Sequence, residues 1–64
     1  MERINRNSRV RVTSYTSKRY IGRIGTVTGV MYNGSEYAYR VTLDSFRHPL
    51  KEWLSGSELQ LIRP

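Results

Sequence analysis

Three glycines interrupt one long run of strand-forming residues, and this pattern limits the possible folds more than any other feature. Gly22, Gly25 and Gly29 all lie within residues 21–32, which otherwise have the composition of a single β-strand. A glycine inside a strand marks a bulge, a sharp bend or the close approach of another backbone. Three of them in one strand predict a sheet that coils tightly on itself.

Alternation of apolar and polar residues predicts further strands on both sides of this segment. Val10 and Val12 alternate with arginines, so we expect the valines to face inward. Asn33-Gly34 is typical of a two-residue type I′ hairpin. After it, four residues share one face of the next strand: Tyr37, Tyr39, Val41 and Leu43.

The remaining residues predict loops, turns and two short strands. Residues 14–20 are polar and have no period, which indicates an exposed loop. Proline closes a turn over residues 45–49, and residues 50–54 and 59–62 have the composition of strands. The residues between these two strands favour a single 3-10 turn, for which either serine could act as the cap.

These elements predict an all-β protein, a small five-stranded barrel with one 3-10 turn before the last strand. The barrel is expected to span residues 8–64, and residues 1–7 are expected to form a flexible basic arm. Barrel closure removes the open strand edges that promote aggregation. Because a domain of 64 residues has little apolar area, we expect Phe46 in the core; in the alternative, it is exposed beside Arg47 and suits stacking or a protein contact. The period of their strand favours core or cross-strand packing for Tyr37 and Tyr39, with Tyr32 opposite Tyr37 across the hairpin. Trp53 is expected in the core or at the mouth of the barrel.

The chain resembles the KOW motif, in which a strand and a loop precede a Gly-x-x-Gly-x-Val segment that enters the next strand. The segments that carry the resemblance are residues 9–12, residues 20–30, which include Gly22, Gly25 and Val27, and the ending 53–61. KOW domains are SH3-like barrels of ribosomal proteins and transcription elongation factors, and many contact RNA or docking proteins. The pattern is also similar to that of the small SH3-like subunits of photosynthetic complexes, such as photosystem I, which engage acidic ferredoxin.

Basic side chains greatly outnumber acidic ones. Eleven lysine and arginine residues oppose five acidic residues, which gives a formal net charge of +6. Nine of the eleven are arginine, whose planar guanidinium group matches phosphate and carboxylate groups and stacks on bases. This balance predicts a polyanionic partner such as nucleic acid, an anionic membrane or an acidic protein. The alternative is a charge that serves solubility alone.

The segment 15–23 is the sharpest candidate for a binding site because it combines cations with aromatic rings. Phosphates require cations, and unstacked bases require aromatic platforms. In the alternative interpretation, Tyr20 covers the mouth of the barrel and the cations are merely solvated. The expected partner-binding residues, including those of neighbouring strands and of the proline turn, are Arg9, Arg11, Tyr15, Lys18, Arg19, Tyr20, Arg23, Arg40 and Arg47.

The sequence gives little support for catalysis. Asp44, Ser45 and His48 are nearly contiguous, whereas a catalytic triad requires groups that converge in space beside an oxyanion hole. One histidine and no cysteine cannot form a zinc site, and no cofactor or small-molecule substrate is expected. The absence of cysteine suits a reducing cytoplasm, and no apolar run is long enough to span a membrane.

We therefore expect a cytoplasmic, non-catalytic module that binds RNA or DNA with weak sequence specificity. The alternative is a docking module for an acidic protein within a larger complex, comparable to the SH3-like photosystem component or to an accessory protein of a phage.

Overall fold

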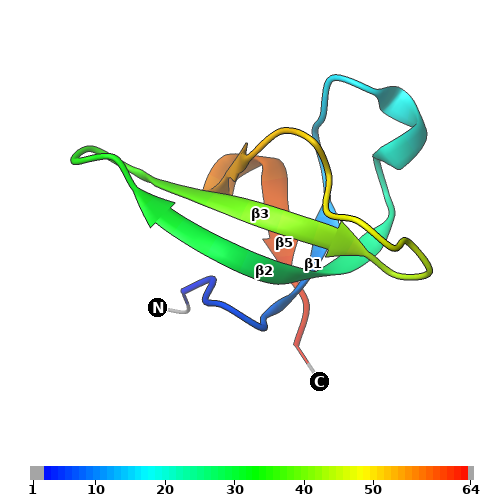
Figure 1. Ribbon diagram of the computed structural model, residues 1–64, viewed down its shortest axis with the longest axis horizontal. Helices are drawn as coiled ribbons and strands as arrows, with labels where there is room; N and C mark the ends of the chain where they lie inside the picture. Colours follow the sequence, from blue (N-terminus) through cyan, green and yellow to red (C-terminus); the bar gives the residue numbers. More distant parts are fainter. Residues whose placement is uncertain (1–2, 64) are drawn as a thin grey trace.

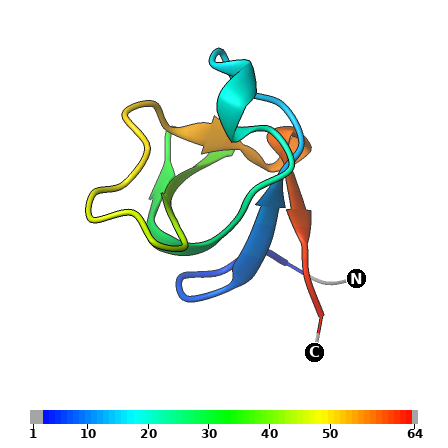
Figure 2. The same cartoon turned by 90° about the vertical axis from the view of Figure 1, so that its right-hand side faces the viewer.

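The computed structural model describes residues 3–63, which form one curled antiparallel sheet. Its five strands lie in the order β4-β3-β2-β1-β5, and the sheet winds into a half-barrel (Figure 1, Figure 2). The strands are β1 (Arg9–Val12), β2 (Ile24–Tyr32), β3 (Tyr37–Leu43), β4 (Leu54–Ser55) and β5 (Leu59–Leu61). The predicted all-β fold is confirmed, and so is the 3-10 turn η2 (Gly56–Glu58) before the last strand. A second 3-10 turn, η1 (Lys18–Tyr20), lies in the connection between β1 and β2.

Strand β2 lies between β1 and β3 and pairs with both. Gly25 lies opposite Val10 of β1 and opposite Leu43 of β3. The pairing with β3 then shifts register between Val27 and Gly29, which leaves one extra residue in β2. A bulge, one of the three features that a glycine within a strand can mark, is therefore present in β2. Because a bulge increases the local twist of the sheet, it allows the outer half of the β2–β3 hairpin to project beyond the other strands (Figure 1).

The core follows the alternation along β1, β2 and β3. Val10 and Val12 are fully buried, whereas the arginines that alternate with them are exposed. Tyr39, Val41 and Leu43 are buried on one face of β3 as predicted, whereas Tyr37 is 40% exposed and packs across the hairpin on Tyr32, at 4.8 Å between ring centroids. Tyr37 lies next to the hairpin loop, one residue before the pairing of β3 with β4 begins at Ala38. The core is completed by Val27, Leu50, Leu54 and Leu59.

The hairpin turn differs from the predicted two-residue type I′ turn. Tyr32 pairs with Tyr37, so four residues form the loop. The side-chain oxygen of Asn33 accepts the backbone N–H groups of Ser35 and Glu36, each at 2.9 Å. An asparagine that bonds its own downstream backbone stabilises a longer turn, which is why the Asn-Gly pair does not form the tight one. Gly34 supplies the positive φ, of 94°.

Three predicted strands are shorter than their apolar patterns suggested, and one of them, β5, ends only one residue early, at Leu61. β2 begins at Ile24 and not at residue 21, because Gly22 adopts a φ of 91° in a turn. β4 contains only Leu54 and Ser55, whereas the sequence predicts a strand over residues 50–54. Leu50 is buried and its N–H donates to the carbonyl of Val41 at 2.7 Å, but the bend that follows it breaks the pairing until Leu54.

The described part of the N-terminal segment lies against the sheet. The N–H of Asn7 donates to the carbonyl of Val27 at 2.7 Å, and Ile4 packs against the core. The Arg3 guanidinium lies 5.6 Å from the centre of the Tyr37 ring. Met1 and Glu2, which belong to the predicted arm, lie outside the described residues. Between residues 3 and 63, no helix has the length and apolar character needed to cross a membrane.

Candidate functional site

Two loops lie at one end of the half-barrel, on the right-hand side of Figure 1, and contact each other through the side chains of Tyr20 and Phe46. One connects β1 to β2 and contains η1, and the other connects β3 to β4. Each loop contributes aromatic and basic side chains. We call the surface that they form the two-loop surface, and its members are Tyr15, Lys18, Arg19, Tyr20, Arg23, Phe46, Arg47 and Lys51. Lys18 is included because it is exposed and lies in η1 beside Arg19.

A row of three aromatic rings joins the two loops. The ring of Tyr20 makes edge-to-face contacts with Tyr15, at 5.8 Å between centroids, and with Phe46, at 5.7 Å. The Tyr15 hydroxyl accepts the N–H of Glu52 at 3.1 Å, which attaches the first loop to the end of the second. Edge-to-face pairs of this kind stabilise beyond the area that they bury. The rings therefore hold the loops in a defined relation.

The prediction that Phe46 lies in the core is wrong. Its side chain is 39% exposed, whereas Leu50 from the same loop is buried. Ser45 has a positive φ of 72°, so the chain reverses direction directly before Phe46. This reversal places the ring beside Tyr20 and not among the core valines. Phe46 is thus a site residue, in agreement with the alternative of an exposed ring beside Arg47 and not with the core position that the sequence favours.

Two guanidinium groups lie over these rings. That of Arg19 lies 5.8 Å from the centre of the Tyr20 ring, and that of Arg23 lies 5.9 Å from the centre of the Phe46 ring. Arg23 also donates from Nε to the carbonyl of Arg19 at 3.5 Å. None of the five cations of the two-loop surface forms an ion pair with a carboxylate of residues 3–63. Their charge is therefore available to an outside anion.

A hollow of about 500 Å³ lies between η1 and the β3–β4 loop. Its lining is mainly apolar and includes Tyr20, Phe46, Pro49 and the buried Leu50. Basic side chains also line it, namely Arg47 and Lys51. The hollow therefore combines apolar contact area with positive charge.

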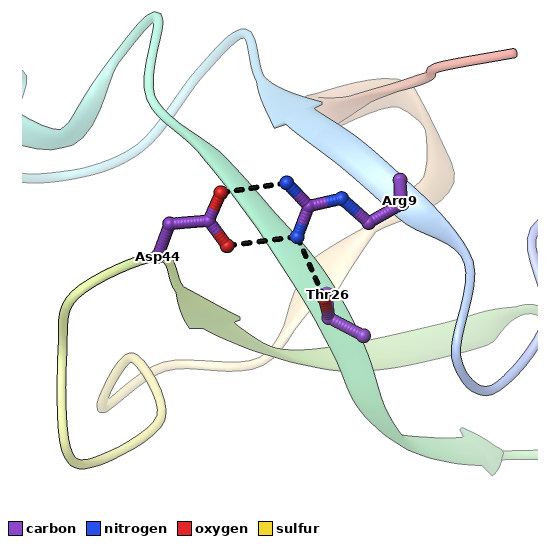
Figure 3. A network of polar contacts seen from close by, with 3 residues as sticks. All are labelled: Arg9, Thr26 and Asp44. Atoms are coloured by element: carbon purple, nitrogen blue, oxygen red, sulfur yellow. Dashed lines mark hydrogen bonds and ion pairs between the residues drawn. The ribbon is translucent and has the colours of Figure 1, made fainter. Parts of the chain in front are cut away.

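Arg9 is engaged within the protein and does not join the two-loop surface. Both of its terminal nitrogens donate to the Asp44 carboxylate, at 2.7 and 2.6 Å, and one also donates to the Thr26 hydroxyl at 2.9 Å (Figure 3). These hydrogen bonds lower the pKa of Asp44 and raise the pKa of Arg9. Both carboxylate oxygens of Asp44, which the sequence places near Ser45 and His48, thus accept hydrogen bonds from Arg9.

Two further predicted site residues take different positions. Arg11 donates to the carbonyl of Gly22 at 3.0 Å and so lies at the base of the β1–β2 loop. Arg40 lies on the outer face of β3, where its guanidinium is 5.0 Å from the centre of the Trp53 ring. Trp53 is 37% exposed and rests beside Gly29, so it lies on this outer face and not in the core. The structure brings together the other six predicted residues: Tyr15, Lys18, Arg19, Tyr20, Arg23 and Arg47.

No three histidine, cysteine, aspartate or glutamate side chains within residues 3–63 converge to hold a metal ion. Comparisons with known proteins found no family model, no curated protein and no solved structure that matches the chain. The geometry described above is therefore the basis for any functional proposal.

Proposed function

We propose that the two-loop surface binds the phosphate backbone of nucleic acid, and that the protein is a non-catalytic binding module with weak sequence specificity. The observation that carries this proposal is the group of cations beside aromatic rings, without carboxylate partners among the described residues. Binding through phosphates depends on such cations, and rings add contacts that every base can make.

The positions of the acidic side chains support the same proposal. Asp44 is neutralised by Arg9, and the Glu58 carboxylate accepts the N–H of Ser55, the N-cap of η2, at 2.9 Å. Glu36 lies in the hairpin loop, which Figure 1 places at the far end of the molecule. Apart from Asp44, Glu52 is therefore the one carboxylate of residues 3–63 that belongs to the two loops. The surface has a strong positive excess, which would attract a polyanion.

The positions of Arg19 and Arg23, which already lie over aromatic rings, also support the proposed binding of nucleic acid. A guanidinium that already lies over a ring has lost part of its freedom before a ligand arrives, so less entropy is lost on binding. The KOW-like glycine spacing agrees with this proposal, because many domains of that family contact RNA. In this proposal Arg11 positions the β1–β2 loop and contributes charge only at its base.

The test is a titration of fluorescein-labelled RNA and DNA oligonucleotides, followed by anisotropy, at several salt concentrations. If the five cations Lys18, Arg19, Arg23, Arg47 and Lys51 each neutralise one phosphate, the log–log salt slope is about −3.5 for a single strand. The triple variant Lys18→Glu, Arg19→Glu and Arg23→Glu should abolish binding and leave the thermal midpoint nearly unchanged, because these side chains are exposed.

A matched control separates this surface from the overall charge. The variant Arg3→Glu, Arg6→Glu and Arg40→Glu changes the net charge by the same amount but lies outside the two-loop surface, and it should retain most of the binding. Equal losses in the two variants would contradict the proposed site. Wild-type protein that binds neither RNA nor DNA would contradict the proposed function and favour an acidic protein as the partner.

A further inference from the structure

We propose that the hollow between η1 and the β3–β4 loop receives one unstacked base, so that the protein prefers single-stranded to double-stranded nucleic acid. This inference rests on the proposed function and specifies the ligand of the same surface. Three features of the surface support it: the size and lining of the hollow, the exposed ring of Phe46, and the cations beside the hollow.

The hollow has the size and chemical character that a base requires. Its volume of about 500 Å³ falls in the range of about 300–1,000 Å³ that is usual for small-ligand clefts. Tyr20, Phe46 and Pro49 present ring surfaces, and Leu50 contributes a buried apolar contact. A base has two apolar faces, which stack well on such rings, and polar edges, which can remain in contact with water.

The exposure of Phe46 is itself informative. The domain has few large apolar side chains, and burial of a phenylalanine is worth about 1.5–3 kcal/mol. Phe46 nevertheless remains 39% exposed while its neighbour Leu50 is buried. A ligand that stacks on the ring would bury its exposed part and so gain the free energy that folding alone leaves unrealised. The contact with Tyr20 keeps the ring at the hollow in the absence of a ligand.

The cations lie where the backbone of a bound strand would pass. Arg47 and Lys51 line the hollow, and Arg23 lies over the Phe46 ring. In a nucleotide the phosphate is separated from the base by a single sugar, so one residue of a strand can place its base on the rings and its phosphate beside a cation. The same arrangement disfavours a duplex, because a paired base must first be extruded at a cost of a few kcal/mol.

The experiment compares a fluorescein-labelled 12-nucleotide single strand of mixed sequence with the blunt duplex of the same length, using the full chain. Wild-type protein should bind the single strand at least about 10-fold more tightly. Phe46→Ala should weaken single-strand binding by about 5- to 150-fold, the equivalent of about 1–3 kcal/mol for one stacked base, and should weaken duplex binding much less, because a paired base does not stack on the ring. The salt slope should not change, because no cation is removed.

Two further variants keep the result interpretable. Tyr32→Ala removes an aromatic ring that is 56% exposed at the far end of the hairpin, and it should leave both affinities unchanged. If Phe46→Ala fails to fold by circular dichroism, Phe46→Leu retains apolar volume without the aromatic face and should show the same selective loss. Equal affinity of wild-type protein for the two ligands, or an equal loss for both in the Phe46 variant, would overturn the base-binding inference alone. Absence of binding to either ligand would overturn the proposed function as well.

Discussion

Gly25 is the position at which the bent sheet is most sensitive to one added methyl group. A Cβ atom built there lies 2.5 Å from the carbonyl oxygen of Thr42, 2.8 Å from the Cα of Leu43 and 3.0 Å from the carbonyl carbon of Thr42. All three are backbone atoms of β3, so none can rotate away. Gly25 also pairs with Val10 on its other side, which prevents β2 from simply retreating. Gly25→Ala must therefore push β2 and β3 apart.

The size of the effect follows from this rigidity. Overpacking of a well-packed site costs about 1–3 kcal/mol, and we expect about 2–3 kcal/mol here because the strand ladder must open. A domain of 64 residues has a total stability of about 3–10 kcal/mol, at roughly 0.05–0.15 kcal/mol per residue. With about 4–8 °C per kcal/mol for a domain of this size, the thermal midpoint should fall by about 8–24 °C.

The assay is thermal and urea unfolding followed by far-ultraviolet circular dichroism, with two glycine controls. At Gly56 the nearest atom to an added Cβ is Cε2 of Tyr39, at 3.8 Å, so Gly56→Ala should change stability by less than about 0.5 kcal/mol. At Gly29 the nearest atoms belong to the side chains of Arg40 and Trp53, at 3.3–3.4 Å, which can move, so Gly29→Ala should be intermediate. If Gly25→Ala unfolds within about 2 °C of Gly56→Ala, the argument from backbone contact is wrong.

Two further predictions concern the core and the ion pair. Val27 is fully buried, so Val27→Ala should destabilise the fold by about 1–3 kcal/mol through a cavity, measured by urea unfolding; a change below about 0.5 kcal/mol would show that the site collapses without cost. The pKa of Asp44 is lowered in the folded state, so its stabilising effect is present above the ordinary aspartate pKa of about 3.9 and is lost as the pH falls through the folded value. Carboxyl chemical shifts should therefore give Asp44 a midpoint below about 3.9 in the wild type and an ordinary midpoint in Arg9→Gln; identical midpoints would contradict the role of Arg9.

The alternation of apolar residues, the glycines and the turn-forming residues predicted several parts of the fold correctly. The alternation around Val10 and Val12 places these residues correctly in the core, and the glycines of residues 21–32 mark the bend and the bulge of β2. The serines before the last strand predict η2, in which Ser55 and Glu58 form a capping interaction. Each of these outcomes is signalled by residue types that are near one another in the chain, so periodicity and turn chemistry are sufficient to predict it.

The errors occur where a distant contact or a side-chain bond outweighs the local pattern. Asn33 bonds its own downstream backbone and lengthens the hairpin loop. Residues 50–54 are apolar enough for a strand, but Leu50 contacts the core singly and the pairing resumes only at Leu54. Phe46 is as apolar as the core residues, yet the left-handed conformation at Ser45 turns it towards Tyr20.

For the candidate site too, some features follow from the sequence and others only from the tertiary structure. The sequence by itself determines the excess of arginine and the cluster of cations and tyrosines in residues 15–23, because these are properties of composition and of near neighbours. Only the tertiary structure decides which cations are free to act together. It pairs Arg9 with Asp44 across 35 positions, places Arg40 over Trp53, and brings Phe46 against Tyr20. The physical reason is that electrostatic and ring contacts act over a few ångströms of space, whatever the separation along the chain, and the curl of the sheet determines which side chains come within that distance.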